Sequence, residues 1–256
     1  MATEPADDSP TTDTQRQAWD YELIDLTRPL TKETVEALFG DLYSAEPYFS
    51  NISAECAMDF TTGNSTAWLL TIPDHVSTHI DAPVHMIEGG ATLEEVDISS
   101  FFGEAVVLDL FVGDVDHGYT AAELEAATPT IERGDIVLIY SGFHDARASQ
   151  RMRQTYLTEE AALWLVERGV KAVGVEPSGI EHTPNGMYEQ GWYKLGANKP
   201  WPAHNALLRN DVYIVEGLTN LDRIKGRRVK FCALPVPVPG LSGFPVRAVA
   251  WIDRAA

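Results

Sequence analysis

Apolar runs with strand character recur along the chain and alternate with helical patterns. Short stretches rich in Val, Ile and Leu, of the length typical of strands, predict β-structure at several places. These stretches occupy residues 21–26, 66–72, 105–112, 135–142, 171–176, 211–218, 229–236 and 246–252.

Helical patterns lie between several of these runs. Thr120 and Glu123 have the spacing of a capping box, which opens a helix. The segment TEEAALWLVERG begins at a Thr that can cap a helix and ends at Gly169, a good C-terminal stop. The segment PAHNALLRN is a shorter helical candidate. Strands that alternate with helices predict an α/β fold, a single domain with a mixed β-sheet and flanking helices over residues 19–256.

The composition is that of a globular protein with an unusual charge. Hydrophobic residues make up 45% of the 256 residues, whereas 38 Asp and Glu face only 19 Lys and Arg, for a net charge of −19. Such a surface repels nucleic acid and anionic membranes, so we expect neither as a partner. An acidic excess of this size is typical of proteins from salt-loving organisms, in which salt screens the repulsion. A merely acidic enzyme from an ordinary organism is the alternative.

The ends and the cysteines favour a cytoplasmic protein. No apolar run approaches the roughly 18 residues of a membrane span, and the N-terminus lacks the basic-then-apolar pattern of a signal peptide. Cys56 and Cys232 are the two cysteines of the chain, too few for a disulfide framework. Residues 1–18 are rich in Thr, Asp and Pro, which predicts a disordered acidic tail.

Candidate chemistry is concentrated in one segment, where His75, His79, Asp81 and His85 fall within eleven residues. Imidazole nitrogens with a carboxylate are the ligands of catalytic Zn²⁺, and they also suit Mn²⁺ or Fe²⁺. Pro83 argues against a continuous helix, and ten extended residues would span about 33 Å. The segment must therefore bend if these residues share an ion. A single histidine in a loop is usually an ordinary hydrogen-bonded residue, so the cluster carries the metal hypothesis.

The residues HVSTHIDAPVH resemble the H-x-G-T-H-x-D-x-P-x-H signature of the cyclase family, which includes bacterial kynurenine formamidases and isatin hydrolases. The sequence departs from the signature at Ser77, where the family usually has Gly. AHNALLRNDVYIVEGL resembles the family's second metal segment, in which a His precedes a Glu by twelve residues, as His204 precedes Glu216 here. IDLTRPL and GFPVRAVAW resemble its first and closing strands, so the resemblance covers about residues 22–252.

This resemblance implies a cyclase-like fold of the swivelling β/α/β type and a centre for one or two Zn or Mn ions. The implied ligands are His75, His79 and Asp81 for one ion, and Asp81, His204 and Glu216 for a second. It also implies that His85 is the general acid/base. Apart from the resemblance, Glu216 is a polar residue at the end of a strand whose other inward residues are apolar.

The resemblance further implies a metal-dependent hydrolase that cleaves an amide C–N bond of a small aromatic amide. An arylformamidase acting on N-formylkynurenine is one example. Isatin hydrolase-like opening of a cyclic amide is an alternative, and so is a non-catalytic metal-binding protein. In the hydrolase, a metal-activated water attacks the carbonyl and His85 transfers the proton to the leaving nitrogen. The resemblance also implies a homo-oligomer, most simply a dimer.

Some segments depart from the family pattern and point to a different substrate. GVEPSGIEH, with Glu176 and Ser178, stands where relatives often have an Asp-containing segment, and SGF over residues 141–143 stands where they have TGW. We expect both segments to line the pocket. Three aromatic residues before His204 could stack on an aromatic substrate, or could serve packing or a dimer contact. They are Trp192, Tyr193 and Trp201.

Overall fold

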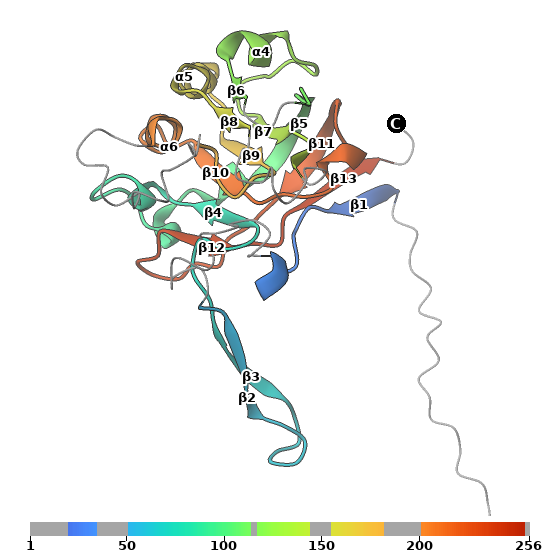
Figure 1. Ribbon diagram of the computed structural model, residues 1–256, viewed down its shortest axis with the longest axis vertical. Helices are drawn as coiled ribbons and strands as arrows, with labels where there is room; N and C mark the ends of the chain where they lie inside the picture. Colours follow the sequence, from blue (N-terminus) through green and yellow to red (C-terminus); the bar gives the residue numbers. More distant parts are fainter. Residues whose placement is uncertain (1–19, 35–50, 114–116, 144–154, 182–200, 254–256) are drawn as a thin grey trace, which may run out of the picture.

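A nine-stranded mixed sheet dominates the computed structural model, which describes residues 20–34, 51–113, 117–143, 155–181 and 201–253 (Figure 1). The predicted tail over residues 1–18 lies outside this part of the chain. Four central strands run parallel, and the strands on either side of them pair antiparallel. In sheet order the strands are β1 (Tyr21–Asp25), β13 (Val249–Asp253), β11 (Arg227–Cys232), β5 (Phe102–Asp109), β7 (Ile136–Tyr140), β9 (Ala172–Val175), β10 (Tyr213–Glu216), β4 (His79–Asp81) and β12 (Gly243–Pro245).

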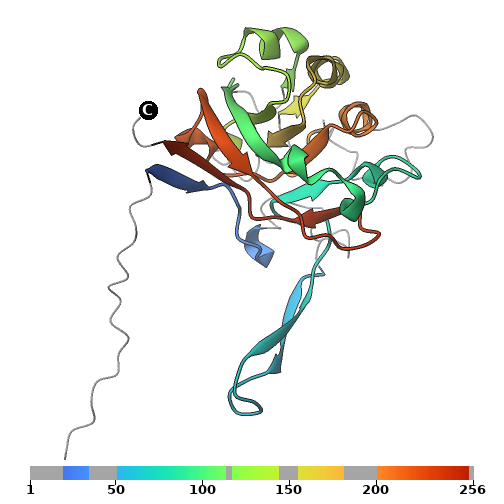
Figure 2. The same ribbon diagram turned by 180° about the vertical axis from the view of Figure 1, so that it is seen from behind.

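Three α-helices cover one side of this sheet, as Figure 1 and the opposite view in Figure 2 show. They are α4 (Ala121–Ala126), α5 (Glu159–Arg168) and α6 (Pro202–Leu208). The predicted capping box opens α4, because the side chains of Thr120 and Glu123 each bond the other's backbone N–H. Helix α5 begins after Thr158 and ends at Gly169, whose φ of 73° is left-handed as a C-terminal stop requires. The predicted α/β class with a mixed sheet is confirmed.

The central strands are apolar on both faces because both faces are buried. Along β5, Val106 and Leu108 join the core under the helices, while Ala105 and Val107 join a second core on the opposite face. Short 3-10 helices help to close that second face through Leu93, Phe101 and Leu221; they are η2 (Leu93–Glu95), η3 (Ile98–Phe101) and η7 (Leu221–Arg223). A further 3-10 helix, η1 (Pro83–His85), follows β4. Two-sided burial explains why these strands form near-continuous Val/Ile/Leu runs in the sequence.

Two small sheets stand apart from the main one. The predicted strand at residues 66–72 is confirmed as β3 (Ala67–Thr71). Among the described strands it pairs only with β2 (Ser53–Met58), in a hairpin that projects away from the body (Figure 1). The other pair is β6 (Gly118–Tyr119) with β8 (Tyr156–Leu157). Sequence patterning identified the strand at residues 66–72 but could not show that it leaves the main sheet.

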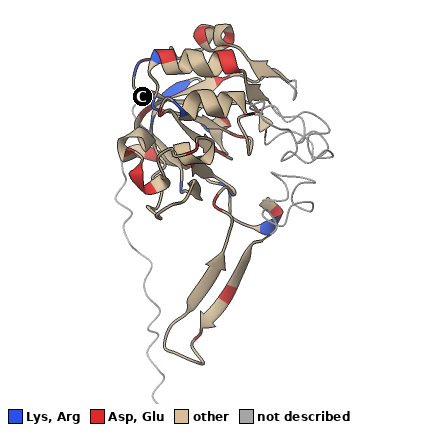
Figure 3. Cartoon of the chain, turned by 90° about the vertical axis from the view of Figure 1, so that its left-hand side faces the viewer, with Lys and Arg blue, Asp and Glu red and all other residues tan. Residues whose placement is uncertain are grey.

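Acidic residues are spread over the outer helices, and the projecting hairpin carries few charged residues (Figure 3). Within the described residues, no helix is both long enough and apolar enough to cross a membrane. Salt adaptation of this surface stays a prediction.

Candidate metal centre

Strand β4 carries the centre of the histidine cluster into the sheet. It pairs with β10, so that His79 lies opposite Glu216, and with β12, so that Asp81 lies opposite Gly243. Alternation along β4 sends Ile80 into the core away from the helices, so His79 and Asp81 project together on the other face. His79 and Asp81 are both 1% exposed.

The segment around β4 bends, as the metal hypothesis required. Only residues 79–81 are extended, and η1 then turns the chain so that His85 returns toward the cluster. Before the strand, Ser77 has a φ of 59°, the left-handed conformation for which Gly is best suited. Gly217 makes this close turn possible, because a Cβ there would lie 2.3 Å from the carbonyl oxygen of Ser77. Ser77 thus keeps a backbone conformation that suits the Gly of the family signature.

The first half of the cluster gathers around one oxygen of Asp81. Asp81 Oδ1 lies 2.7 Å from His75 Nδ1 and 3.4 Å from His79 Nε2. Side-chain donor atoms of these three residues all lie within 4.8 Å of one another. The ring of His75 fits here because residue 243 is Gly; a Cβ at that position would lie 2.6 Å from the His75 Cε1 atom.

The second half faces the other oxygen of Asp81. His204, on α6, places its Nε2 atom 3.5 Å from Asp81 Oδ2 and 3.3 Å from Glu216 Oε1. Glu216 connects the two halves, because its Oε2 atom lies 3.6 Å from His79 Nε2. The structure therefore brings together all the residues that the sequence proposed as ligands.

His85 stands against both halves. Its ring lies over that of His75, with centroids 3.9 Å apart, and 5.9 Å from the ring of His204. Donor atoms of Asp81, His85 and His204 also lie within 4.8 Å of one another. His85 is close enough to act on a molecule bound at the cluster, and close enough to be a further donor itself.

The carboxylates of the cluster raise the pKa of both His79 and His204. Burial acts to lower the pKa of His79, but the hydrogen bond and charge of Asp81, with the charge of Glu216, raise it to about 9. Burial acts to lower the pKa of His204, but the nearby carboxylates of Asp81, Glu181 and Glu216 favour the charged ring and raise the pKa well above its usual value.

The pKa values of Asp81 and His85 are instead lowered. Burial acts to raise the pKa of Asp81, but the neighbouring histidines hold it well below its usual value. Burial, together with repulsion from the surrounding histidines, outweighs the attraction of Asp81 and lowers the pKa of His85 to about 3. His85 is therefore a neutral imidazole at pH 7, as a proton acceptor must be.

The donor set fits a divalent metal ion. Carboxylates of Asp81, Glu181 and Glu216 are each at most 4% exposed, and burying such charges is costly without a cation. Asp81 Oδ2 is buried and has no hydrogen-bond partner among the described residues. Imidazole and carboxylate donors are those that Zn²⁺ and Mn²⁺ take. A bound metal ion would explain why this oxygen has no hydrogen-bond partner although nitrogen donor atoms lie around it.

Two supports of the ligands escaped the sequence analysis. Glu181 Oε1 accepts hydrogen bonds from the backbone N–H of His204, at 2.8 Å, and from its Nδ1, at 3.2 Å, so Nε2 is left to face Asp81. His75 Nε2 lies 2.8 Å from Ser242 Oγ, which donates in turn to Asp74 Oδ2. Nothing in the sequence spacing pointed to Glu181 or Ser242, because the contacts form only when distant segments meet.

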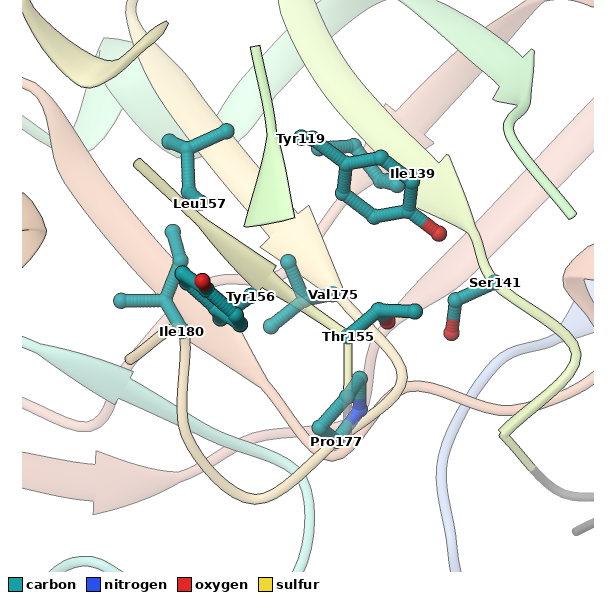
Figure 4. Close-up of a pocket in the computed structure, with 9 residues that line it drawn as sticks. All are labelled: Tyr119, Ile139, Ser141, Thr155, Tyr156, Leu157, Val175, Pro177 and Ile180. Atoms are coloured by element: carbon teal, nitrogen blue, oxygen red, sulfur yellow. The ribbon is translucent and has the colours of Figure 1, made fainter. Parts of the chain in front are cut away.

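The expectation that Glu176 lines the pocket needs correction. Its carboxylate is fully buried and accepts hydrogen bonds from the backbone N–H groups of Ser141 and Gly142, so it holds the turn after β7. Ser141 itself lines a small cavity of about 10 Å³ with Tyr119 and Thr155 (Figure 4). That volume suits about one water molecule, so the cavity is no substrate site.

The aromatic residues expected near the substrate are only partly described. Trp192, Tyr193 and their neighbours lie outside the described residues. The ring of Trp201 lies 6.1 Å from that of His204, in an edge-on arrangement. Trp201 therefore borders the second half of the cluster.

Comparison with known proteins gives a consistent set of relatives. The family described as putative cyclase matches residues 24–182, a range that includes His75 to His85 and ends before His204. A kynurenine formamidase from Geobacillus thermodenitrificans is 27% identical over 73% of this chain and 80% of its own. A kynurenine formamidase from Erythrobacter litoralis is 29% identical over 66% of this chain and 69% of its own.

Solved structures agree on the fold. A potential metal-dependent hydrolase with cyclase activity has a TM-score of 0.67 and 26% identity, over 91% of this chain and 98% of its own. Isatin hydrolase A from Labrenzia aggregata has a TM-score of 0.74 and 22% identity, over 92% and 95%. The predicted cyclase-like architecture is thereby confirmed.

Proposed function

The chain belongs to the family of putative cyclases, and from that premise we propose that it is a metal-dependent hydrolase of amide C–N bonds. The observation that supports this most strongly is Asp81, a buried carboxylate whose two oxygens face separate groups of nitrogen donors. Relatives named kynurenine formamidase support an aryl formamide, such as N-formylkynurenine, as the substrate.

His75, His79 and Asp81 would hold one ion, and Asp81, His204 and Glu216 a second. Zn²⁺ and Mn²⁺ are the ions we propose. A metal bound there supplies Lewis-acid activation of water and of the substrate carbonyl. Glu181 keeps the Nε2 atom of His204 directed at the centre, and burial of the ligands excludes bulk water from the face of β4.

His85 would be the group that moves the proton. Burial lowers the pKa of His85 and keeps its ring neutral, and a ring nitrogen of a neutral imidazole can accept a proton from the attacking water. The same nitrogen can then deliver that proton to the leaving amine, as cleavage of an amide requires. Its ring lies beside those of His75 and His204, and so against both halves of the cluster.

Hydrolysis assays of His85→Ala beside the wild-type protein test this assignment. We expect the wild type to hydrolyse N-formylkynurenine, and His85→Ala to lose about 10²–10⁴-fold in kcat with its metal content retained, as removal of a general acid/base predicts. Unchanged turnover in His85→Ala would contradict the catalytic role. A protein that binds metal but hydrolyses neither N-formylkynurenine nor isatin would be the non-catalytic alternative, and hydrolysis of isatin alone would favour the cyclic-amide alternative.

We also propose a homodimer in the cytoplasm. Two-fold pairing is the commonest assembly of soluble enzymes. Cys56 and Cys232 are unpaired in the structure, as they would be in a reducing compartment.

A further inference from the structure

Two histidines of the cluster are each held at Nδ1, which directs the other ring nitrogen to the centre. His79 Nδ1 lies 3.1 Å from the carbonyl oxygen of Ser77, and His204 Nδ1 lies 3.2 Å from Glu181 Oε1. A carbonyl or carboxylate oxygen only accepts hydrogen bonds, so the hydrogen of each neutral ring lies on Nδ1. His79 and His204 therefore present the lone pair of Nε2 to Asp81.

The ring of His75 is oriented the other way round. Its Nδ1 atom lies 2.7 Å from Asp81 Oδ1, and its Nε2 atom lies 2.8 Å from Ser242 Oγ. The partner of Nε2 is a hydroxyl group, which can either donate or accept a hydrogen bond. The tautomer of His75 thus depends on the direction in which Ser242 donates its hydrogen.

Asp74 determines that direction. Ser242 Oγ donates a hydrogen bond of 2.8 Å to Asp74 Oδ2. Because a hydroxyl carries one hydrogen, Ser242 can then only accept from His75 Nε2. The ring hydrogen of His75 therefore lies on Nε2. Asp74 Oδ2 is itself 3.6 Å from His75 Nε2, beyond hydrogen-bond distance, so it acts through the hydroxyl.

A count of hydrogens shows where a cation belongs. The contacts form a chain that begins and ends on a carboxylate: Asp81, His75, Ser242 and Asp74. A neutral imidazole and a hydroxyl bring one hydrogen each, so these two hydrogens cannot serve all three contacts. The contact that lacks a hydrogen is the one between His75 Nδ1 and Asp81 Oδ1. His79 Nε2 faces the same oxygen at 3.4 Å, so a metal ion there would have donor atoms from both rings.

We propose that His75 binds the metal through Nδ1, whereas His79 and His204 bind through Nε2. Asp74 is then the positioning residue that selects Nδ1 of His75, and it acts through the hydroxyl of Ser242. The inference rests on the metal centre of the proposed function. It adds the ligand atom of His75 and the residue that holds the ring in the required tautomer.

A crystal structure of the Zn²⁺-loaded protein tests the ligand atom. We expect His75 Nδ1 at about 2 Å from the ion, with the contact between His75 Nε2 and Ser242 retained. Zn²⁺ bound through His75 Nε2 would overturn this inference and leave the proposed hydrolase in place. A protein that binds no Zn²⁺ would overturn both.

Substitution of Asp74 tests its positioning role. Asp74→Ala lets Ser242 donate to His75 Nε2, which favours a ring hydrogen on Nδ1, where the metal should bind. Zn²⁺ affinity, measured by competition with a chelating dye, should fall about tenfold, as for loss of a residue that orients a ligand. The control Glu88→Gln removes one charge from an exposed residue of the same segment and should change affinity by less than about twofold. Circular dichroism shows whether each variant is folded.

A double substitution separates positioning from the general effect of a negative charge. In Ser242→Ala the hydroxyl is absent, so Asp74 can no longer act through it. Adding Asp74→Ala to this variant should lower Zn²⁺ affinity by no more than about threefold, because coupled residues are not additive. Equal losses from Asp74→Ala with and without Ser242 would overturn the positioning role, and so would full affinity in Asp74→Ala alone.

Discussion

The two halves of the histidine cluster meet at Asp81 but are built in different ways. His75 and His79 reach Asp81 from within one bent segment of the chain. His204 and Glu216 come from α6 and β10, more than a hundred residues later in the sequence. The local half depends on the backbone of β4, whereas the distant half depends on how α6 and β10 pack against it.

The supports of the two halves differ in the same way. His75 is held by the hydroxyl of Ser242, and this hydroxyl donates a hydrogen bond to Asp74. His204 is held directly by the buried carboxylate of Glu181, through both its ring and its backbone. The distant half should therefore be the more sensitive to loss of a single supporting side chain, and graded substitutions can test that difference.

The largest effect is expected where the halves meet. Asp81→Ala removes both carboxylate oxygens, one of which faces each half, so both halves should lose metal together. We expect kcat/KM to fall by more than about 100-fold, beyond what loss of an outer support typically costs. Metal analysis and hydrolysis assays on the same preparation check this. Retention of one full metal per chain would show that one half holds an ion without Asp81.

Glu216→Ala should affect only the distant half. In a two-metal enzyme we expect bound metal to fall from two toward one per chain, with a sharp fall in kcat. His75→Ala is the matched change in the local half. If Glu216 only orients water, metal content should hold while activity falls about 10–100-fold. Unchanged metal and unchanged activity would make Glu216 a structural residue.

Substitution of Glu181 or Ser242, the residues that hold His204 and His75, compares metal binding by the two halves while the ligands themselves stay intact. Glu181→Gln keeps the shape of the side chain but removes the charge that orients His204, so metal affinity should fall by about 10–100-fold. Ser242→Ala should cost less, because His75 retains its 2.7 Å contact with Asp81. Competition with a chelating dye measures both affinities. A larger loss in Ser242→Ala would reverse the predicted ranking of the supports.

The smallest effect is a pH dependence of metal binding. His79, with a pKa raised to about 9, is protonated at pH 7, and a metal must displace that proton. The apparent affinity should rise by up to about tenfold per pH unit for each displaced proton and level off above about pH 9. In the metal-free protein the same proton stabilises the fold below about pH 6.5, and this contribution is lost as pH rises through about 9.

Calorimetry in two buffers of different ionisation enthalpy counts the protons released. His204→Ala should reduce the count, because the pKa of His204 is also raised. Binding without proton release at pH 7 would contradict the raised pKa values.

The same contrast explains how much the sequence could predict. Strands with two buried faces, such as β5, and capped helices, such as α5, leave a clear local pattern. The local half of the cluster was a candidate metal site from spacing alone, because its residues are close in sequence, and the family resemblance then assigned its ligands. His204 and Glu216 could be proposed only through the family resemblance, since no spacing links them to Asp81.

The remaining features depend on contacts that no local pattern encodes. Glu181 supports His204 only after β9 and α6 have come together, and Glu176 turned out to hold a turn because its carboxylate meets the backbone of a neighbouring loop. Likewise, β3 has an ordinary strand sequence, and only the fold shows that it lies in the projecting hairpin.

The most direct test of metal-dependent amide hydrolysis is the rate of N-formylkynurenine cleavage before chelation, after chelation, and after Zn²⁺ or Mn²⁺ is returned. We predict that activity is lost on removal of the metal and restored by its return in the wild type, but not in Asp81→Ala. Full activity in protein verified to be free of metal would contradict the account.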